Sequence, residues 1–258
     1  MAKKSYKINK GGGYIVKHIL VKLGREYFEK NQAEEKPHDF NVSEQANALL
    51  NDLEHYPHAF VLAALMDRQL PAEKAWELPA RIKKLVGDFE IESLGKLSLE
   101  EYKRLFNENK LHRYNDTMGE VFYRAVHRII DVYGGNISKI WSDTPSSTDV
   151  VSRFRRFHGC GQKISTMAAN ILARDLYVSF SDYKAIDVSA DVHVCRVMKR
   201  LGLIDTEDRD DAIETAREIS PEFPGIIDYP LWNIGKTWCH ATNPDCMNCI
   251  VQNECQKK

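Results

Sequence analysis

Residues 157–163 read Phe-His-Gly-Cys-Gly-Gln-Lys, an apolar residue followed by two glycines one position apart and then two polar residues. Gly159 and Gly161 permit a tight turn, because glycine adopts backbone conformations that other residues rarely adopt. A helix that begins near Gln162 would add the partial positive charge of its N-terminal end. The stretch therefore predicts two helices joined by a short hairpin, and the backbone N–H groups of this hairpin form a suitable binding site for a phosphate.

Most of the chain shows helical periodicity. Asn41-Val-Ser-Glu44 and Ser98-Leu-Glu-Glu101 are capping-box patterns, and the apolar run from Ala59 to Met66 fits a buried helix. The clearest amphipathic stripe extends from Met118 to Val132 and ends at Gly134-Gly135, a typical C-terminal stop. No stretch alternates as a strand does, so the predicted class is all-α. Further helical patterns cover about 71–82, where Pro79 predicts a kink or a break, and about 148–157, 162–177, 191–201, 207–219 and 225–238.

The composition limits the classes of protein to consider. The 258 residues are 43% hydrophobic and 28% charged, which suits one large or two small folded domains, and the net charge of −1 gives no overall attraction to nucleic acid. The chain has no apolar run that spans a bilayer and no secretory signal at its start, so we expect a cytoplasmic protein. Gly11–Gly13 predict a flexible joint. Local basic groups comprise Lys3, Lys4, Lys7, Lys10, Lys17, Lys22 and Arg25, and then Arg153, Arg155 and Arg156.

Four of the six cysteines lie within the last twenty residues, with the spacing C-x6-C-x2-C-x5-C. Four thiolates on one short loop hold either an iron–sulfur cluster or a tetrahedral zinc ion. In a cytosolic chain, clustered cysteines bind metals more often than they form disulfides. The spacing predicts a metal or cluster site and leaves iron and zinc open. The four predicted ligands are Cys239, Cys246, Cys249 and Cys255.

This cysteine spacing resembles the [4Fe-4S] loop in the endonuclease III and adenine glycosylase branches of the helix-hairpin-helix (HhH-GPD) DNA glycosylase superfamily. Gly235-Lys-Thr-Trp-Cys239 likewise resembles the helix that leads into the first ligand of the family, and the resemblance covers about residues 40–255. It implies a structural [4Fe-4S] cluster in place of zinc. In the family the loop also presents basic residues to DNA, whereas here it reads His240-Ala-Thr-Asn-Pro-Asp245.

The same resemblance implies two catalytic residues. Lys163 falls where bifunctional members carry a lysine whose neutral amine attacks the sugar C1′ and forms a Schiff base. Asp191-Val-His-Val-Cys-Arg196-Val resembles the family segment Asp-Thr-His-x-x-Arg-Val, whose aspartate stabilises an oxocarbenium-like transition state or activates the lysine or a water. Read without the family, Lys163 is a surface lysine and Asp191 is a helix N-cap.

Other parts of the active-site region are also open to interpretation. Asp187 is a nearby competitor of Asp191 but lacks the following histidine and arginine, while His193 and Arg196 are expected to be structural supports. The chain is several residues longer than usual for the family between Lys163 and Asp191. We expect the extra residues within 175–189.

Two loops resemble the family segments that enter the duplex. Met66-Asp-Arg-Gln69 implies that Gln69 fills the gap left when the target nucleotide is extruded. Leu111-His-Arg-Tyr-Asn115 resembles the second wedge loop, where Arg113 replaces an apolar residue and is expected to stack on or hydrogen-bond to the unpaired base. The contacts expected with phosphates come from Arg156, Gly159, Gly161 and Gln162.

The sequence thus predicts an all-α protein with two helical lobes, and DNA in the cleft between them. Residues 40–165 would form a helical-barrel lobe, and residues 1–39 and 166–258 a cluster lobe, with Lys163 and Asp191 facing each other across the cleft. The expected activity is that of a monomeric, bifunctional DNA glycosylase and AP lyase of the endonuclease III-like branch. Its expected partner is double-stranded DNA with a damaged base or abasic site, and oxidised pyrimidines are the leading substrate class.

Three alternatives stay open at this point. The first is a monofunctional glycosylase in which Asp191 activates water and Lys163 only binds phosphate. The second is a non-catalytic iron–sulfur protein that binds damaged DNA. The third is a zinc module joined to an unrelated helical domain.

Overall fold

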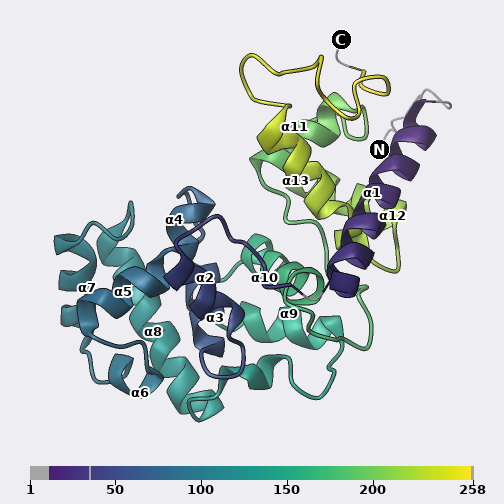
Figure 1. Cartoon of the computed structure of the whole chain (residues 1–258). Helices are drawn as coiled ribbons and strands as arrows, with labels where there is room; N and C mark the ends of the chain where they lie inside the picture. The colour runs from purple at the N-terminus through teal and green to yellow at the C-terminus, as the bar shows by residue number, and fades with distance from the viewer. Residues whose placement is uncertain (1–11, 35, 257–258) are drawn as a thin grey trace, which may run out of the picture. The chain divides into compact units, whose positions relative to one another are not determined.

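The computed structural model describes residues 12–34 and 36–256, and these residues form two compact units. One unit contains residues 12–33 and 182–256, and the other is Glu34–Ser181. Every regular element in the described part of the chain is a helix (Figure 1). The predicted all-α class with two helical units is therefore confirmed. None of these helices combines the length and apolar composition that a bilayer-crossing segment needs.

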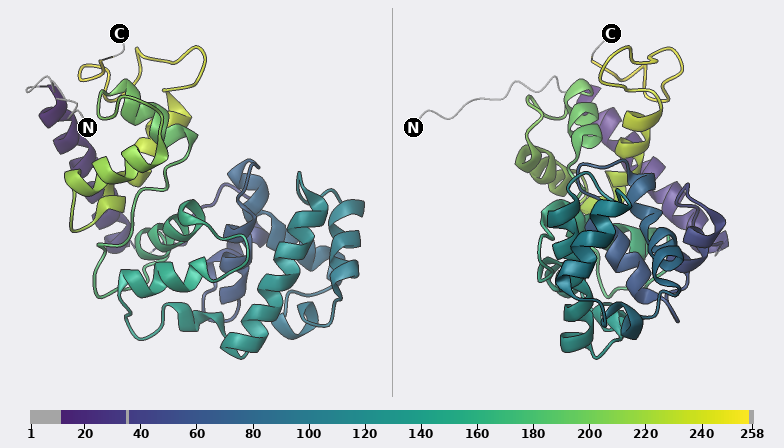
Figure 2. Two further views of the ribbon diagram at one scale, coloured as in Figure 1. Left: turned by 180° about the vertical axis from the view of Figure 1, so that it is seen from behind. Right: turned by 90° about the vertical axis from the view of Figure 1, so that its left-hand side faces the viewer.

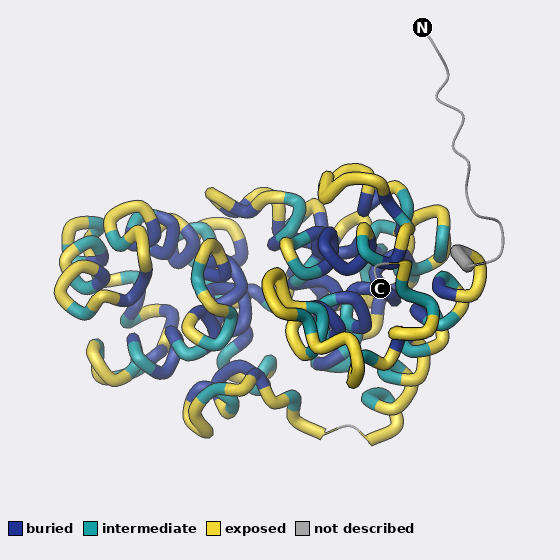
Figure 3. Tube along the Cα trace, turned by 90° about the horizontal axis from the view of Figure 1, so that it is seen from above, coloured by how far each residue is buried: buried dark blue, intermediate teal, exposed yellow. Residues whose placement is uncertain are grey.

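The unit Glu34–Ser181 is built around one fully buried helix. All ten residues of α3, from Pro57 to Met66, are buried. Because this helix is apolar on every side, it is stable only with neighbours on every side. Those neighbours are helices α2, α4, α5, α8 and α10 and the 3-10 helix η1. The predicted buried helix at residues 59–66 is thus the centre of the unit, and Figure 3 shows buried segments inside and exposed turns outside.

The helices of this unit follow the signals in the sequence closely. Ser98 caps its helix through the reciprocal hydrogen bonds of a capping box with Glu101. The long amphipathic stripe forms α8 and ends at Gly134 in the left-handed conformation, as predicted. Pro79 coincides with a break between α4 and α5. The bounds are α2 (Glu44–Asn51), α3 (Pro57–Met66), α4 (Ala72–Trp76), α5 (Leu78–Val86), α6 (Ile91–Leu94), α7 (Leu99–Glu108), α8 (Asn115–Tyr133), η1 (Ile137–Ile140), α9 (Ser147–Arg155) and α10 (Gln162–Arg174).

The start of α2 differs from the predicted capping box. Ser43, and not Asn41, is the N-cap residue, and its side chain accepts a hydrogen bond from the N–H of Ala46. Ser43 also donates its hydroxyl hydrogen to Glu77 Oε1, at 2.7 Å. The carboxylate that completes this cap is therefore that of Glu77 at the end of α4, and not that of Glu44. A capping-box pattern covers four adjacent residues and cannot show a contact with a distant residue.

The other unit contains α1 together with the C-terminal helices. Its core joins Val16 and Leu20 of α1 to apolar residues of the later helices, and Cys239, Cys249 and Cys255 pack against this core. After α13 the chain continues as a loop of turns and bends (yellow in Figure 2). The bounds are α1 (Gly12–Glu34), α11 (Val192–Arg200), α12 (Arg209–Ile219), η2 (Pro224–Ile227) and α13 (Asp228–Thr237).

Helix α1 corrects one expectation. Gly12 and Gly13 were expected to belong to a flexible joint, but they begin a helix of 23 residues. The helix is held by burial of Val16 and Leu20, which lie one turn apart on one face. Gly11 and the basic residues Lys3, Lys4, Lys7 and Lys10 lie outside the described residues.

The division between the units falls between Ser181 and Asp182, whereas we expected a boundary at residue 165. Residue 165 lies inside α10, a continuous helix from Gln162 to Arg174. This helix packs against α9 and α3, so its whole length belongs with the unit built around α3.

Gly24 tests how α1 is held in its unit. A Cβ atom on Gly24 would lie 1.9 Å from the carbonyl oxygen of Ile226, a backbone atom that cannot rotate away. We expect Gly24→Ala to lower the free energy of unfolding by about 2 kcal/mol, because overpacking outweighs the roughly 1 kcal/mol that alanine gains over glycine in a helix. Urea unfolding of the full chain measures this change. Glu29→Ala, at an exposed position of α1, is the control, and a more stable Gly24→Ala would contradict the packing of α1 described above.

Candidate functional site

The predicted hairpin lies between α9 and α10, and α10 begins at Gln162 as the sequence indicated. Phe157 is buried and anchors the turn in the core. Gly159 has a φ of +79°, which favours glycine, but Gly161 has a φ of −91°, which any residue adopts. Only the first of the two glycines is thus required by the turn itself. Burial raises the pKa of the Cys160 thiol to about 12, so this cysteine is no nucleophile at neutral pH.

The N-terminal end of α10 has no side-chain cap. Its N-cap is Gly161, which has no side chain to accept a hydrogen bond from the first turn, whereas Ser98 and Ser146 cap their helices. The N–H groups at a helix start favour an anion. Arg156 is exposed at the end of α9, while Arg153 Nη1 donates to the carbonyl of Ile140 at 2.7 Å and so has a structural role.

Three successive residues after α3 contact three different parts of the predicted site. Asp67 Oδ2 lies 2.7 Å from Lys163 Nζ at the start of α10. The Arg68 Nη1 atom lies 2.8 Å from the place that a Cβ atom on Gly159 would take. Gln69 Oε1 accepts a hydrogen bond of 2.8 Å from the Tyr114 hydroxyl. The sequence pointed only to Gln69, and the missed signal is that Asp67 and Arg68 directly follow a fully apolar helix.

The loop that carries Arg113 is also tied to the end of α3. His112 is buried, with Nε2 at 3.2 Å from the carbonyl of Met66, and its Nδ1 accepts the N–H of Tyr114 at 3.0 Å. Burial lowers the pKa of His112, so the ring is neutral at pH 7 and has the one donor and one acceptor that these contacts require. Arg113 is exposed and lies over the Tyr114 ring, at 5.6 Å from its centre.

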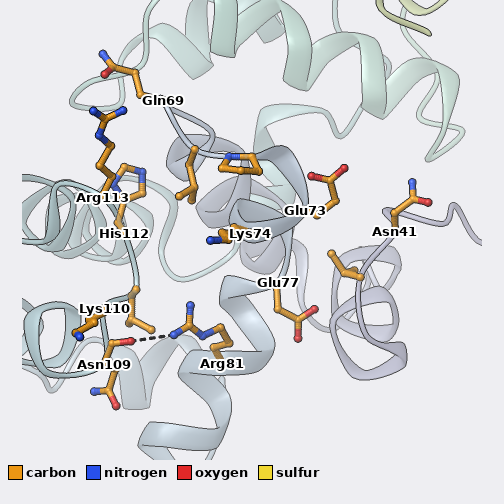
Figure 4. A pocket seen from close by; sticks show the side chains of 14 residues that line it. Asn41, Gln69, Glu73, Lys74, Glu77, Arg81, Asn109, Lys110, His112 and Arg113 are labelled. Atoms are coloured by element: carbon orange, nitrogen blue, oxygen red, sulfur yellow. Dashed lines mark hydrogen bonds between the residues drawn. The ribbon is translucent and has the colours of Figure 1, made fainter. Parts of the chain in front are cut away.

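The structure brings the two predicted wedge residues to one cleft. Gln69 and Arg113 lie on the same side of a cleft of about 810 Å³, which Figure 4 shows from close by. Gln69 has a φ of +51°, an uncommon conformation for a residue other than glycine. Such backbone strain often marks functional loops. Neither Lys163 nor Asp191 lines this cleft.

Lys163 and Asp191 belong to different units. Asp191 is the N-cap of α11, and its Oδ1 accepts the N–H groups of His193 and Val194 at 2.8 and 2.9 Å. Within the described part of the chain, Asp191 Oδ2 accepts no hydrogen bond from the protein. The cap and a catalytic role are therefore compatible, because they use different oxygen atoms of the same carboxylate.

The competing aspartate has a structural partner. Asp187 is buried and pairs with Arg217 through two hydrogen bonds of 2.7 Å each, a bidentate pair that occupies both carboxylate oxygens. The neighbouring Ser189 N–H donates to buried Asp228 at 2.5 Å. These contacts hold the segment before Asp191 in place.

Two arginines of α11 hold the start of the cysteine loop. Arg196 is buried, and its guanidinium donates to the carbonyls of Cys239 and Gly235 at 2.8 and 2.9 Å, in line with the expected supporting role. Arg200 Nη1 lies 3.2 Å from Cys239 Sγ and also donates to the carbonyl of His240 at 2.7 Å. No motif in the sequence pointed to Arg200. It follows Arg196 by four residues and so lies on the same face of α11.

The four predicted ligands lie on one loop of the unit that contains α11 and α13. The pKa of Cys249 is raised by burial and by the nearby thiols of Cys239, Cys255 and Cys246, so these three sulfurs lie within electrostatic reach of Cys249. In the described part of the chain, no three His, Cys, Asp or Glu side chains are placed to hold one metal ion.

Comparisons with known proteins give consistent relatives. No family model matches the chain. Endonuclease III of Thermotoga maritima is 25% identical over 166 residues, which are 64% of this chain and 67% of that protein. An endonuclease III homolog of Encephalitozoon cuniculi is 32% identical over 84 residues, 31% of this chain and 34% of that protein. The chain thus spans about two thirds of the first relative and one third of the second.

Solved structures share the fold over nearly the whole chain. A non-covalent endonuclease III–DNA complex has a TM-score of 0.62 and 16% identity and covers 95% of both chains. A trapped endonuclease III–DNA covalent intermediate with an estranged adenine gives 0.58 and 16%, over 92% of this chain and 96% of that one. A thermostable thymine-DNA glycosylase gives 0.60 and 13%, over 93% and 95%.

The chain therefore shares the helical fold of the solved endonuclease III structures. The sequence matches and the shared fold make the chain similar to endonuclease III.

The two hairpin glycines provide a matched pair of variants. Gly159→Ala puts a side chain into the left-handed region and towards Arg68, and we expect it to lower the free energy of unfolding by about 1–2 kcal/mol. A Cβ atom on Gly161 meets no atom within 4 Å. Gly161→Ala should change stability by less than about 0.5 kcal/mol, because reduced unfolded-state entropy offsets the poorer N-cap. Urea unfolding measures both, and equal losses would contradict the different roles assigned to the two glycines.

Proposed function

We propose that this protein is a DNA glycosylase of base-excision repair that also cleaves abasic sites. The observation that carries the proposal is the placement of Lys163 in the first turn of α10. This turn follows the hairpin directly and has no side-chain cap, and the Lys163 amine lies 2.7 Å from the Asp67 carboxylate. Sequence similarity to endonuclease III supports the same class of activity. Double-stranded DNA with a damaged base or an abasic site is the proposed partner, and oxidised pyrimidines are the proposed substrate class. We further propose that the protein is a monomer and that it acts in the cytoplasm on nucleoid DNA.

In this proposal each residue has a separate task. The Lys163 amine attacks C1′ of the target nucleotide, the glycosidic bond breaks, and its electron pair leaves with the base. The Asp191 carboxylate stabilises positive charge on the sugar as that bond breaks. The C1′–O4′ bond then breaks as the C1′=Nζ Schiff base forms, and loss of a C2′ proton permits β-elimination of the 3′ phosphate. Gln69 and Arg113 fill the duplex where the nucleotide has left it, and the hairpin with Arg156 binds a phosphate.

The proposal includes a [4Fe-4S] cluster held by Cys239, Cys246, Cys249 and Cys255. When bound, the cluster fixes the C-terminal loop in one conformation and supplies no group to the reaction. Arg196 and Arg200 of α11 position the loop from the protein side through their contacts with Cys239 and His240.

Borohydride trapping tests the proposed activity. Incubation with duplexes that carry a panel of lesions or an abasic site should give a covalent protein–DNA complex, because borohydride reduces the Schiff base to a stable amine. Lys163→Ala should abolish this complex. Lys96→Ala removes an exposed lysine of the same unit and should leave trapping unchanged. The lesion that is trapped fastest identifies the substrate class.

The other outcomes distinguish the competing functions. Base release without a trapped complex would replace the proposal with a monofunctional glycosylase in which Asp191 activates water. Binding to damaged duplexes with neither base release nor trapping would identify a non-catalytic DNA-binding protein.

The cofactor assignment has its own test. Protein purified without oxygen should be brown and contain about four iron atoms per chain. Cys246→Ser should lose most of this iron, because serine replaces a thiolate ligand. Cys160→Ala and Cys195→Ala alter the two buried cysteines outside the loop, and both variants should keep their iron. A colourless protein with one zinc ion would refute the assignment.

A further inference from the structure

The contact between Asp67 and Lys163 joins residues 96 positions apart in the sequence. Asp67 caps the C-terminal end of α3, and Lys163 lies in the first turn of α10. Lys163 Nζ donates to Asp67 Oδ2 at 2.7 Å and to the Asp67 carbonyl at 3.4 Å. One residue thus receives two contacts from the amine that the proposed reaction uses.

The two side chains differ in burial. The Asp67 side chain is 10% exposed and the Lys163 side chain is 33% exposed, so the carboxylate lies on the inner side of the pair and the amine on the side open to solvent. Burying a carboxylate is costly unless a partner compensates for the lost hydration. A bound substrate can therefore reach the amine while the carboxylate stays behind it.

The partner of Asp67 is unusual among the buried aspartates of this protein. Asp187 pairs with Arg217 and Asp175 with Arg174, and an arginine keeps its proton at any physiological pH. Asp228 accepts from Ser189. Asp67 is the buried aspartate whose described ion pair is with a lysine, a cation that can release its proton to the partner.

We infer that Asp67 accepts the proton of Lys163 when the amine becomes a nucleophile. This inference rests on the proposed function. The ammonium proton moves from Nζ to Asp67 Oδ2, the freed electron pair forms the Nζ–C1′ bond, and the glycosidic electron pair leaves with the base, which takes a proton from water. On an abasic sugar the same amine adds to the C1′ aldehyde, and water leaves as the iminium forms.

The place of Asp67 suits a fixed proton acceptor. It directly follows Met66, the last residue of a helix that is buried along its whole length, so its backbone has little freedom to move. Asp67 and Lys163 also belong to one unit, whereas Asp191 belongs to the other. The two carboxylates therefore have separate roles. Asp67 accepts the proton of Lys163, and Asp191 stabilises the positive charge on the sugar.

The test is single-turnover trapping with cyanoborohydride on duplex DNA that carries an abasic site, which follows attack by the amine without base release. Asp67→Asn keeps the shape and one oxygen of the side chain but cannot accept the proton. Its trapping rate at pH 7 should fall about 100-fold or more, the usual range for loss of a general base, while the affinity for DNA is unchanged. The deficit should shrink as the pH rises, because hydroxide then deprotonates the lysine.

Two further variants separate this chemistry from structure. Asp67→Glu retains a carboxylate and should recover part of the rate. Asp131→Asn removes the same charge at an exposed position of α8 and should leave the rate unchanged. Thermal unfolding of each variant shows whether the fold is intact.

The outcomes distinguish this inference from the proposed function. If the wild-type protein traps but Asp67→Asn traps as fast or faster, Asp67 only holds the ammonium, and this inference fails alone. A loss in Asp67→Asn that is the same at every pH would also overturn it, since that result indicates positioning without proton transfer. If the folded wild-type protein traps no abasic or lesion duplex at any pH, the proposed function fails.

Discussion

The burial of α3 is the constraint on which the unit Glu34–Ser181 depends. A helix that is apolar on every side cannot face solvent, so α2, α4, α5, α8 and α10 surround it. Its C-terminal end is fixed as a result, and the next three residues reach three places at once. Asp67 contacts Lys163, Arg68 lies against Gly159, and Gln69 accepts from Tyr114. Hydrophobic packing thereby sets the positions of polar groups that do the proposed chemistry.

The other unit ends in a loop that forms turns and bends but no helix, so side-chain contacts must hold this loop in place. Arginines on α11 hold that loop through carbonyl groups and the Cys239 sulfur, and Val251 anchors it in the core. The same helix begins with Asp191, whose Oδ1 caps it. One short helix therefore supports the cysteine loop at one end and presents a proposed catalytic carboxylate at the other.

Much of this organisation could be predicted from local signals. The capping box at Ser98, the stop at Gly134 and the break at Pro79 act within a few residues, and each has the predicted effect. The expectations that differ depend on distant residues. Glu77 receives the hydroxyl of Ser43 across 34 positions, and the first turns of α1 are stabilised by a core built mainly from residues after 187. No window of adjacent residues contains that information.

The sequence by itself determined the all-α class, most helix boundaries, the cysteine spacing and the motif around Lys163, because these follow from periodicity, capping and residue type. Only the tertiary structure decided which side chains meet. In the folded chain Lys163 pairs with Asp67, and Asp187 pairs with Arg217. The turn needs glycine at position 159, where φ is positive, but not at position 161. The physical reason is that ion pairs and backbone conformation depend on how buried helices pack, and packing brings together residues that are far apart in the chain.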